Sequence, residues 1–216
     1  MKAFGRFCRD NGLSIAFWLL FALTLVGQIA TGMRLQREHA IANPDPQTLP
    51  GYLLNPEFLR GVFGNWQAAL LQLLALIVLT VFLRQRGAAH SRKSDEELAR
   101  EGHRRHLHWF GKSFSWAYAN SLSLAVGTLF ALTFALFVRV DFLAYNAERI
   151  RLGEAALDLP RFLGSARFWF DVFQTWQAEF FAMGAFLLMS ISLRQEGSAE
   201  SKPVGASDDA TGDPNE

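Results

Sequence analysis

Two long apolar segments of this chain each occur twice, and this repeat constrains the fold more than any other feature of the sequence. Residues 11–24 (NGLSIAFWLLFALT) match residues 120–133 (NSLSLAVGTLFALT) at nine of 14 positions. Residues 49–91 match residues 159–201 at 16 of 43 positions, centred on a shared VFxxWQA motif. Because a repeat of this length is a supersecondary unit, each copy is expected to form the same arrangement of helices.

Each copy contains two apolar stretches long enough to cross a membrane. Residues 11–33, 61–83 and 113–138 contain no charged residue, and the fourth stretch, 172–193, contains only Glu179. About 20 apolar residues cross a hydrocarbon core about 30 Å thick. A helix of a soluble bundle would keep a polar stripe, which these stretches lack. We therefore predict an all-α membrane protein with four transmembrane helices, at about residues 12–33, 62–83, 117–139 and 172–193.

The number of crossings in each copy determines how the copies are related. Two crossings return the chain to its starting side, so both copies enter the membrane from the same face. The fold class is then two parallel tandem helical hairpins related by a pseudo-twofold axis along the membrane normal. We expect a first repeat at residues 1–92, a charged cytoplasmic linker at 93–112, a second repeat at 113–197 and a disordered acidic tail at 198–216.

The distribution of basic residues predicts the orientation. The net charge is only +1, but 13 Lys and Arg residues lie in the N-terminal segment, the central linker and the tail, against eight in the two other connections. The positive-inside rule therefore places both termini in the cytoplasm. A cleaved signal peptide is the alternative interpretation of the first apolar stretch, but the same stretch recurs in the middle of the chain.

The two outer connections are expected to contain short amphipathic segments. Pro50 and Pro160 each precede an apolar, aromatic stretch that leads into the next apolar span. We interpret each stretch as a short segment at the membrane interface. The proline-rich middle of the first connection is expected to be irregular, whereas the third helix is expected to continue beyond its apolar part.

One carboxylate in the fourth span is the leading candidate for a functional residue. Glu179 has Ala69 at its matching position in the first copy, and an ionisable side chain inside a membrane is costly to bury. Its candidate polar neighbours are Gln67, Gln72 and Gln177. Two interpretations stay open: a proton or cation site, or a neutral acid that is hydrogen-bonded between helices.

Several other polar residues occur in both copies. Asn11 and Asn120 are expected to be helix N-caps. The hydroxyls of Thr24 and Thr133 can bond the carbonyl four residues back. A third pair, Arg84 and Arg194, ends its spans at the inner surface, where arginine suits both the helix C-terminus and anionic lipid.

The sequence contains no motif that points to catalysis. Phosphate loops, nucleophile elbows and dinucleotide fingerprints are absent. His103, His106 and His108 are close together, but intervening arginines disfavour a metal ion. We therefore expect no enzyme activity, no cofactor and no nucleic-acid partner. The expected partners are membrane lipids and either another protein or further copies of the chain.

The doubled pattern resembles that of a family of bacterial multi-pass membrane proteins described as a domain of unknown function. The residues that carry the resemblance are RDNGLS at 9–14, NWQ at 65–67, FLRQRG at 82–87, NSLS at 120–123, WQAEF at 176–180 and LRQEGSAESKP at 193–203. The resemblance implies a bacterial inner-membrane protein and brings no activity with it. Ala69 departs from the family pattern, which has a Glu after WQ-x in both copies, so a paired-carboxylate role is in doubt here.

These observations leave two hypotheses about function. The first is a non-enzymatic structural or accessory membrane protein that acts through lipid or protein contacts. The alternative is a small channel or transporter with a central polar site that includes Gln67, Gln177 and Glu179.

Overall fold

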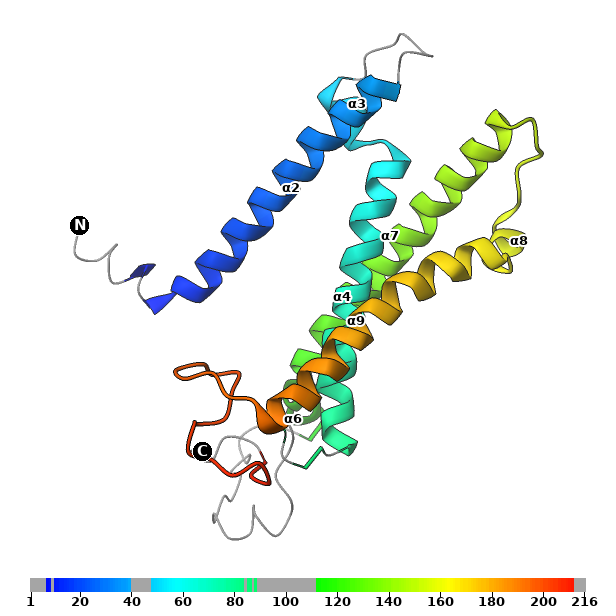
Figure 1. Cartoon of the computed structure of the whole chain (residues 1–216). Coiled ribbons are helices and arrows are strands. Elements are labelled where there is room, and N and C mark those ends of the chain that lie inside the picture. Colours follow the sequence, from blue (N-terminus) through cyan, green and yellow to red (C-terminus); the bar gives the residue numbers. More distant parts are fainter. Residues whose placement is uncertain are drawn as a thin grey trace. The chain divides into compact units, whose positions relative to one another are not determined.

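The computed structural model describes residues 7–8, 10–39, 48–83, 85–86, 88 and 112–211, without the side chains of 36–39 and 112–115. Within these residues the protein is all-helical and contains no strand. The main helices are α2 (Gly12–His39), α4 (Pro56–Phe82), α7 (Ser121–Arg151) and α9 (Ala166–Ser192), and shorter helices precede three of them: α3 (Leu49–Leu53), α6 (Lys112–Ala119) and α8 (Leu159–Leu163) (Figure 1). The predicted charged linker at residues 93–112 lies outside the described residues, except for Lys112 at the start of α6.

Three of the four long helices are long and apolar enough to cross a membrane. They cover Gly12–Leu35, Pro56–Phe82 and Ser121–Arg151. α9 has 27 residues, the same length as α4, but it is less apolar and carries Arg167, Asp171 and Glu179. The prediction of helices at all four apolar stretches is confirmed; the membrane crossing of α9 stays a prediction.

The short helices within the two outer connections begin at matched positions. α3 and α8 both have five residues and begin 110 residues apart, at Leu49 and Leu159. Thr48 and Asp158 are their N-caps, and each accepts a hydrogen bond from the backbone N–H three residues on, at 3.4 Å and 3.0 Å. The predicted short segments after Pro50 and Pro160 are therefore helical turns, with proline near the helix start, where no N–H is needed.

The third long helix continues well beyond its apolar part, as expected from the sequence. α7 ends at Arg151 with Gly153 in the left-handed region, at φ 77°. Gly153 N–H donates to Ile150 O at 3.0 Å and Glu154 N–H to Arg149 O at 2.9 Å, which is the Schellman arrangement. Asn146 then exchanges two hydrogen bonds with the backbone of Leu157, at 3.0 and 2.8 Å, and so anchors the loop that leads to α8.

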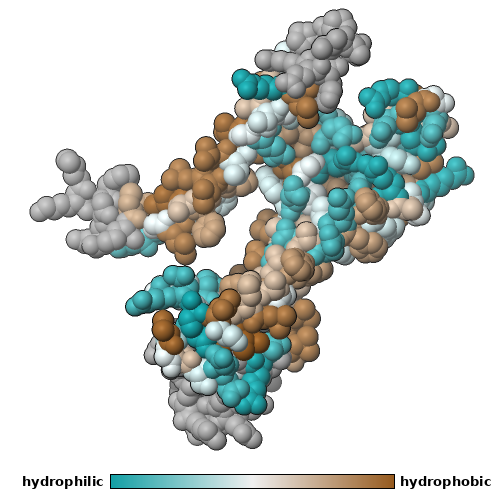
Figure 2. Space-filling model, in the orientation of Figure 1, coloured by the Kyte–Doolittle hydropathy of each residue, from teal (hydrophilic) through white to brown (hydrophobic). Residues whose placement is uncertain are grey.

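The chain divides into two compact units, residues 1–59 and 60–216. In the first unit, buried Tyr52 of α3 packs its hydroxyl against Gly32 of α2 and its ring against Phe58, with ring centroids 5.0 Å apart. Most hydrophobic side chains of α2 are exposed, and Figure 2 shows hydrophobic residues over most of its surface.

The core of the second unit is aromatic and lies between α7, α8 and α9. Phe137, Phe162, Phe168 and Val172 are buried together, each at most 2% exposed. Phe168 contacts both Phe137 and Phe162, with centroids 6.3 and 5.2 Å apart. α4 joins this core through Gly64, because a Cβ there would lie only 3.3 Å from the Phe137 ring. The absence of a side chain at Gly64 thus brings α4 close to α7.

The C-terminal segment differs from the prediction of a disordered tail. Residues 198–211 form a series of turns in which Lys202 is only 1% exposed. Composition alone indicates disorder there, but a lysine and an arginine organise the backbone, as described below. Residues 212–216 lie outside the described residues.

Candidate functional site

A cluster of charged side chains joins three helices of the second unit. Nη1 of Arg60, on α4, lies 3.5 Å from Oδ1 of Asp141 on α7 and 3.4 Å from Oδ2 of Asp171 on α9. Both distances are longer than the usual charge-assisted N–H···O bond of about 2.7–2.9 Å, as expected when one nitrogen contacts two carboxylates. The Arg60 guanidinium is therefore shared between two carboxylates on different helices.

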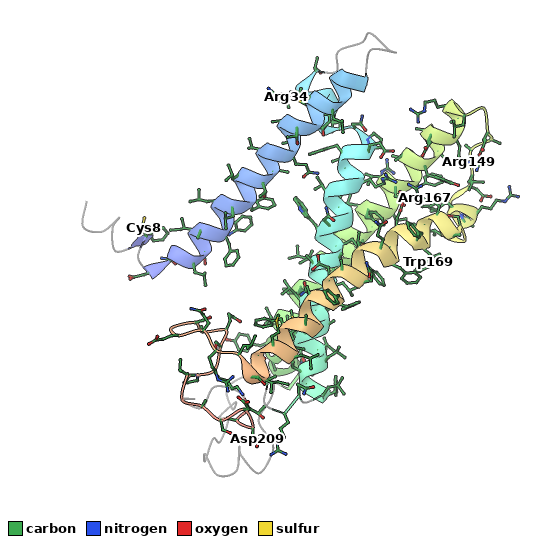
Figure 3. The ribbon with its side chains drawn as sticks, in the orientation of Figure 1. Cys8, Arg34, Arg149, Arg167, Trp169 and Asp209 are labelled. Atoms are coloured by element: carbon green, nitrogen blue, oxygen red, sulfur yellow. The ribbon has the colours of Figure 1, made fainter. Side chains whose placement is uncertain are left out.

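A second arginine completes this ionic layer. Arg167 lies one turn before Asp171 on α9, and its Nε donates to Asp171 Oδ2 at 3.0 Å. Figure 3 labels Arg167 near the N-terminal end of α9. The i,i+4 spacing brings the two side chains together on one face of the helix. With two arginines and two aspartates, the layer is balanced in charge.

Asp141 is the buried member of the layer. It is 1% exposed, and its Oδ2 has no hydrogen-bond partner among the described residues. An unsatisfied buried acceptor costs on the order of 1–3 kcal/mol, and more when it is charged. The arrangement therefore leaves one oxygen able to take a proton or a donor from a ligand.

A second, uncharged layer lies about two turns further along α4. Gln67 is fully buried, and its Oε1 accepts a hydrogen bond from Trp176 Nε1 at 2.8 Å. Its Nε2 donates to Gly64 O at 3.0 Å and to Thr175 Oγ1 at 3.5 Å. The Thr175 hydroxyl in turn donates to Val172 O at 2.9 Å. The amide of Gln67 thus links α4 to α9.

Helical spacing explains why these residues meet. Arg60, Gly64 and Gln67 are four and three residues apart, so they lie on one face of α4. Asp171 and Thr175 are four apart on α9, with Trp176 beside them. Each of the two facing helices therefore presents a charged residue near its start, followed by Gln67 about two turns later on α4 and by Trp176 about one and a half turns later on α9.

The structure places the predicted site residues in different surroundings. Gln67 is the buried centre of the uncharged layer, whereas Gln177 is exposed and Gln72 and Glu179 are half-buried. Among the described residues, Gln72, Gln177 and Glu179 make no side-chain hydrogen bond. The partners of Gln67 are Trp176 and Thr175 instead of the glutamines and the glutamate grouped with it by position.

The residues shared by both copies have local roles. Thr24 donates to Leu20 O at 2.9 Å and Thr133 to Leu129 O at 2.8 Å, each four residues back. Asn120 occupies the N-cap position of α7, but its side chain does not form the expected cap bond. Its Nδ2 donates to Trp116 O in the preceding helix α6 at 2.8 Å, and the same carbonyl accepts the Asn120 backbone N–H at 3.0 Å.

Asn11 donates in the same way, from Nδ2 to Phe7 O at 3.0 Å. Arg194 follows α9 and contacts the C-terminal segment. The matching Arg84 lies outside the described residues.

Sequence reasoning missed Arg60, Asp141 and Asp171 because they flank the apolar stretches instead of interrupting them. A signal was present: all three lack a charged counterpart in the other copy. Arg60 matches Phe170, Asp171 matches Gly61, and Asp141 matches Gly32. Charges of opposite sign that occur in only one copy each are candidates for pairing with one another.

Comparison with known families identifies the chain. A family model described as a domain of unknown function, DUF6766, matches residues 4–213. The protein belongs to the DUF6766 family. A search of curated proteins found no match, and a search of solved structures found none either. Membership of DUF6766 supports the resemblance inferred from the doubled motifs and assigns no activity to the polar layers.

Proposed function

We propose that this DUF6766 protein crosses the bacterial inner membrane four times, as two tandem hairpins with both termini in the cytoplasm. Three helices are apolar and long enough to span. The support for the fourth is the match between α9 and α4, which have equal lengths and start 110 residues apart. Two of the charged residues of α9, Arg167 and Asp171, lie in its first two turns and pair with each other, so Glu179 is the single charge further along the helix.

The position of the two termini tests this topology. Cys8 is the single cysteine of the chain, and Val204 is 63% exposed in the C-terminal segment. In intact cells, a membrane-impermeant maleimide should label neither Cys8 nor a Val204→Cys variant made in a Cys8→Ser background. Both should react after permeabilisation, whereas Leu54→Cys in the outer connection should react before it. Three crossings would place Cys8 and position 204 on opposite sides.

Within this topology we propose a non-enzymatic accessory role, in which the protein acts through lipid or protein contacts. The observation that carries it is the Gln67 layer. The fully buried Gln67 uses the oxygen and the nitrogen of its amide to bond Trp176, Gly64 and Thr175, and so holds α4 to α9. A polar side chain used in this way stabilises helix packing. In Figure 2, hydrophobic residues cover much of the surface of the helices between α8 and the C-terminal segment, a surface suited to lipid or partner helices.

Reconstitution distinguishes this role from transport. Purified protein in vesicles should produce no proton or cation flux above that of empty vesicles. Crosslinking in native membranes should give a defined adduct, with a partner protein or a second copy. Flux that depends on the protein would contradict the accessory role.

One observation favours a second function, a proton- or cation-coupled channel or transporter. Asp141 combines near-complete burial with an oxygen that has no partner among the described residues. If vesicles carry flux, comparison of Asp141→Asn with Glu179→Gln locates the site. Loss in the first variant alone assigns the pathway to the ionic layer; loss in the second alone assigns it to the polar site first inferred from the sequence.

A further inference from the structure

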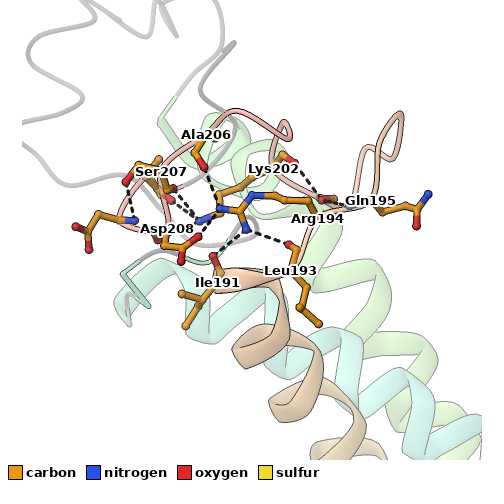
Figure 4. A network of polar contacts seen from close by, with 11 residues as sticks. Ile191, Leu193, Arg194, Gln195, Lys202, Ala206, Ser207 and Asp208 are labelled. Carbon is orange, nitrogen blue, oxygen red and sulfur yellow. Dashed lines mark hydrogen bonds and ion pairs between the residues drawn. The ribbon is translucent and has the colours of Figure 1, made fainter.

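The C-terminal segment folds back on the end of α9 through one arginine (Figure 4). Nη1 of Arg194 donates to Ile191 O and Leu193 O, at 2.9 and 3.0 Å. Its Nη2 donates to Ala206 O at 3.0 Å and to Asp208 Oδ1 at 2.8 Å. The arginine side chain is 12% exposed, whereas the Asp208 side chain is 64% exposed.

A buried lysine holds the rest of the segment. Lys202 Nζ donates to the carbonyls of Ser207, Asp208 and Ala210, at 3.2, 3.0 and 3.2 Å. Burial lowers the pKa of this ammonium, and the nearby Arg194 acts in the same direction. The three carbonyls offset the cost of that burial by filling all three N–H donors. The turn 202–210 is therefore a small folded unit that presents Asp208 to Arg194.

The Asp208 carboxylate fills only part of the Arg194 fork. Nε and Nη2 lie on one edge of the guanidinium and together form a bidentate site for a carboxylate or a phosphate. Asp208 engages Nη2, whereas Nε is buried and has no partner among the described residues. A group with further acceptor oxygens would satisfy both nitrogens.

We propose that Arg194 is a binding site for the phosphate of an anionic phospholipid headgroup, and that Asp208 occupies this site as an internal competitor. This inference rests on the proposed topology, which places the end of α9 at the cytoplasmic surface, where anionic lipid accumulates. The exchange replaces the ion pair with Asp208 by an ion pair with the phosphate, and the phosphate completes the guanidinium fork. Asp209 lies 3.4 Å from Arg86, and both side chains are largely exposed, so the segment also contacts a second basic residue of the same unit.

Hydrogen exchange on the reconstituted full chain tests the proposal. The readout is the exchange of the Ala206 and Ala210 amides, which bond to Pro203 O and Ser207 O at 2.9 and 3.1 Å. In phosphatidylcholine vesicles these amides should be protected. Replacing half of the lipid with phosphatidylglycerol should speed their exchange severalfold. Asp208→Asn should exchange fast in both lipids, and Arg194→Gln should be fast in both with no lipid dependence.

Matched controls separate the competing explanations. Asp209→Asn, the neighbouring acid, and Arg161→Gln, an exposed arginine before α9, should keep the wild-type response to phosphatidylglycerol. Inorganic phosphate added to phosphatidylcholine vesicles should not release the segment; release would reassign the site to free phosphate and overturn the lipid proposal. Unchanged exchange in phosphatidylglycerol, for protein that floats with the vesicles, would also overturn it. Failure to float with the vesicles would instead contradict the proposed topology.

Discussion

At the scale of single residues, the chain relies on a few close contacts between helices. Trp176 donates a hydrogen bond to the fully buried Gln67, and the hydroxyl of Tyr52 packs against Gly32. The first contact requires the indole N–H of Trp176, and the second requires that residue 32 has no Cβ. Removing the indole N–H or adding the Cβ should therefore have effects larger than those of surface substitutions.

Trp176→Phe should destabilise the protein, because it leaves the Gln67 Oε1 without its donor inside the bundle. The expected loss is about 1 kcal/mol, the scale of one buried hydrogen bond, measured by thermal unfolding in detergent with circular dichroism. Trp169→Phe is the matched control, since the Trp169 indole also donates a hydrogen bond, in this case to the backbone carbonyl of Leu163, but Trp169 is 41% exposed. An equal loss in both variants would show that the Gln67 bond does not matter.

Gly32→Ala should destabilise the first unit, because the new methyl group would overlap the hydroxyl of buried Tyr52. Overpacking of this kind costs about 1–3 kcal/mol. Tyr52→Phe removes the overlapping oxygen and should recover part of the loss in the double variant. Gly27→Ala, on the same helix with no heavy atom within 4 Å, should be neutral or stabilising. A loss from Gly27→Ala as large as that from Gly32→Ala would rule out the contact as the cause.

At the scale of elements, α4, α7 and α9 are joined by charge as well as by the aromatic core. Arg60 reaches one carboxylate on each of the other two helices, and Arg167 supports Asp171 from within α9. A shared guanidinium has a consequence for packing. The contacts of α4 with α7 and with α9 both depend on the Arg60 side chain, so its removal should weaken both contacts.

Arg60→Met should be strongly destabilising, because it leaves the Asp141 carboxylate buried without its cation. Breaking a buried pair from one side costs about 3–5 kcal/mol. Adding Asp141→Asn removes the stranded charge and should recover much of the loss. Arg161→Met, whose partner Asp158 is 3.8 Å away and whose side chain is 77% exposed, should change stability by less than about 0.5 kcal/mol. A double variant less stable than Arg60→Met alone would show that the unpaired Asp141 charge is not the cause of the destabilisation.

At the scale of the whole molecule, the chain forms two compact units, and the contacts described here fall within one or the other. Gly32 and Tyr52 belong to residues 1–59, whereas Arg60 and its aspartates belong to residues 60–216. The contact of Tyr52 with Gly32 and the ion pairs of Arg60 with Asp141 and Asp171 involve different residues. Their energetic effects should then be independent.

A double variant tests this independence. Gly32→Ala and Arg60→Met combined should lower stability by the sum of the two single losses, within about 0.5 kcal/mol. Hydrogen exchange should localise each effect: faster exchange in α2 and α3 for the first substitution, and in α7 and α9 for the second. A coupling well above that limit would indicate that the two units unfold together.

Much of the helical architecture could be predicted from the sequence, because the signals for it are local. Apolar runs predicted all four long helices, and Pro50 and Pro160 predicted α3 and α8, two of the three shorter helices. The continuation of α7 was expected, and Gly153 in the left-handed conformation closes this helix after Arg151. Other ends were less accurate: α2 continues to His39 and α4 begins at Pro56, beyond the predicted spans at 12–33 and 62–83. Apolar length marks only the part of a helix suited to hydrocarbon, so polar turns that extend it were underestimated.

The candidate site was predicted only in part. Gln67 was selected because its type recurs in both copies, and it is the buried member of its layer. It was grouped with Gln177 and Glu179 because their positions in the predicted spans place them at a similar depth in the membrane. Whether side chains touch also depends on which face of each helix points toward the other helices. Trp176 and Thr175 are the residues of α9 that contact Gln67.

The sequence by itself determined the number, order and apolar character of the long helices and their doubled pattern, since these follow from composition and periodicity over short distances. Only the tertiary structure decided that Arg60 meets Asp171, 111 residues away, and Asp141 on a third helix. It also decided that Lys202 gathers three carbonyls into a folded tail. The physical reason is that helix rotation and crossing bring distant charges together, and no local pattern encodes either of them.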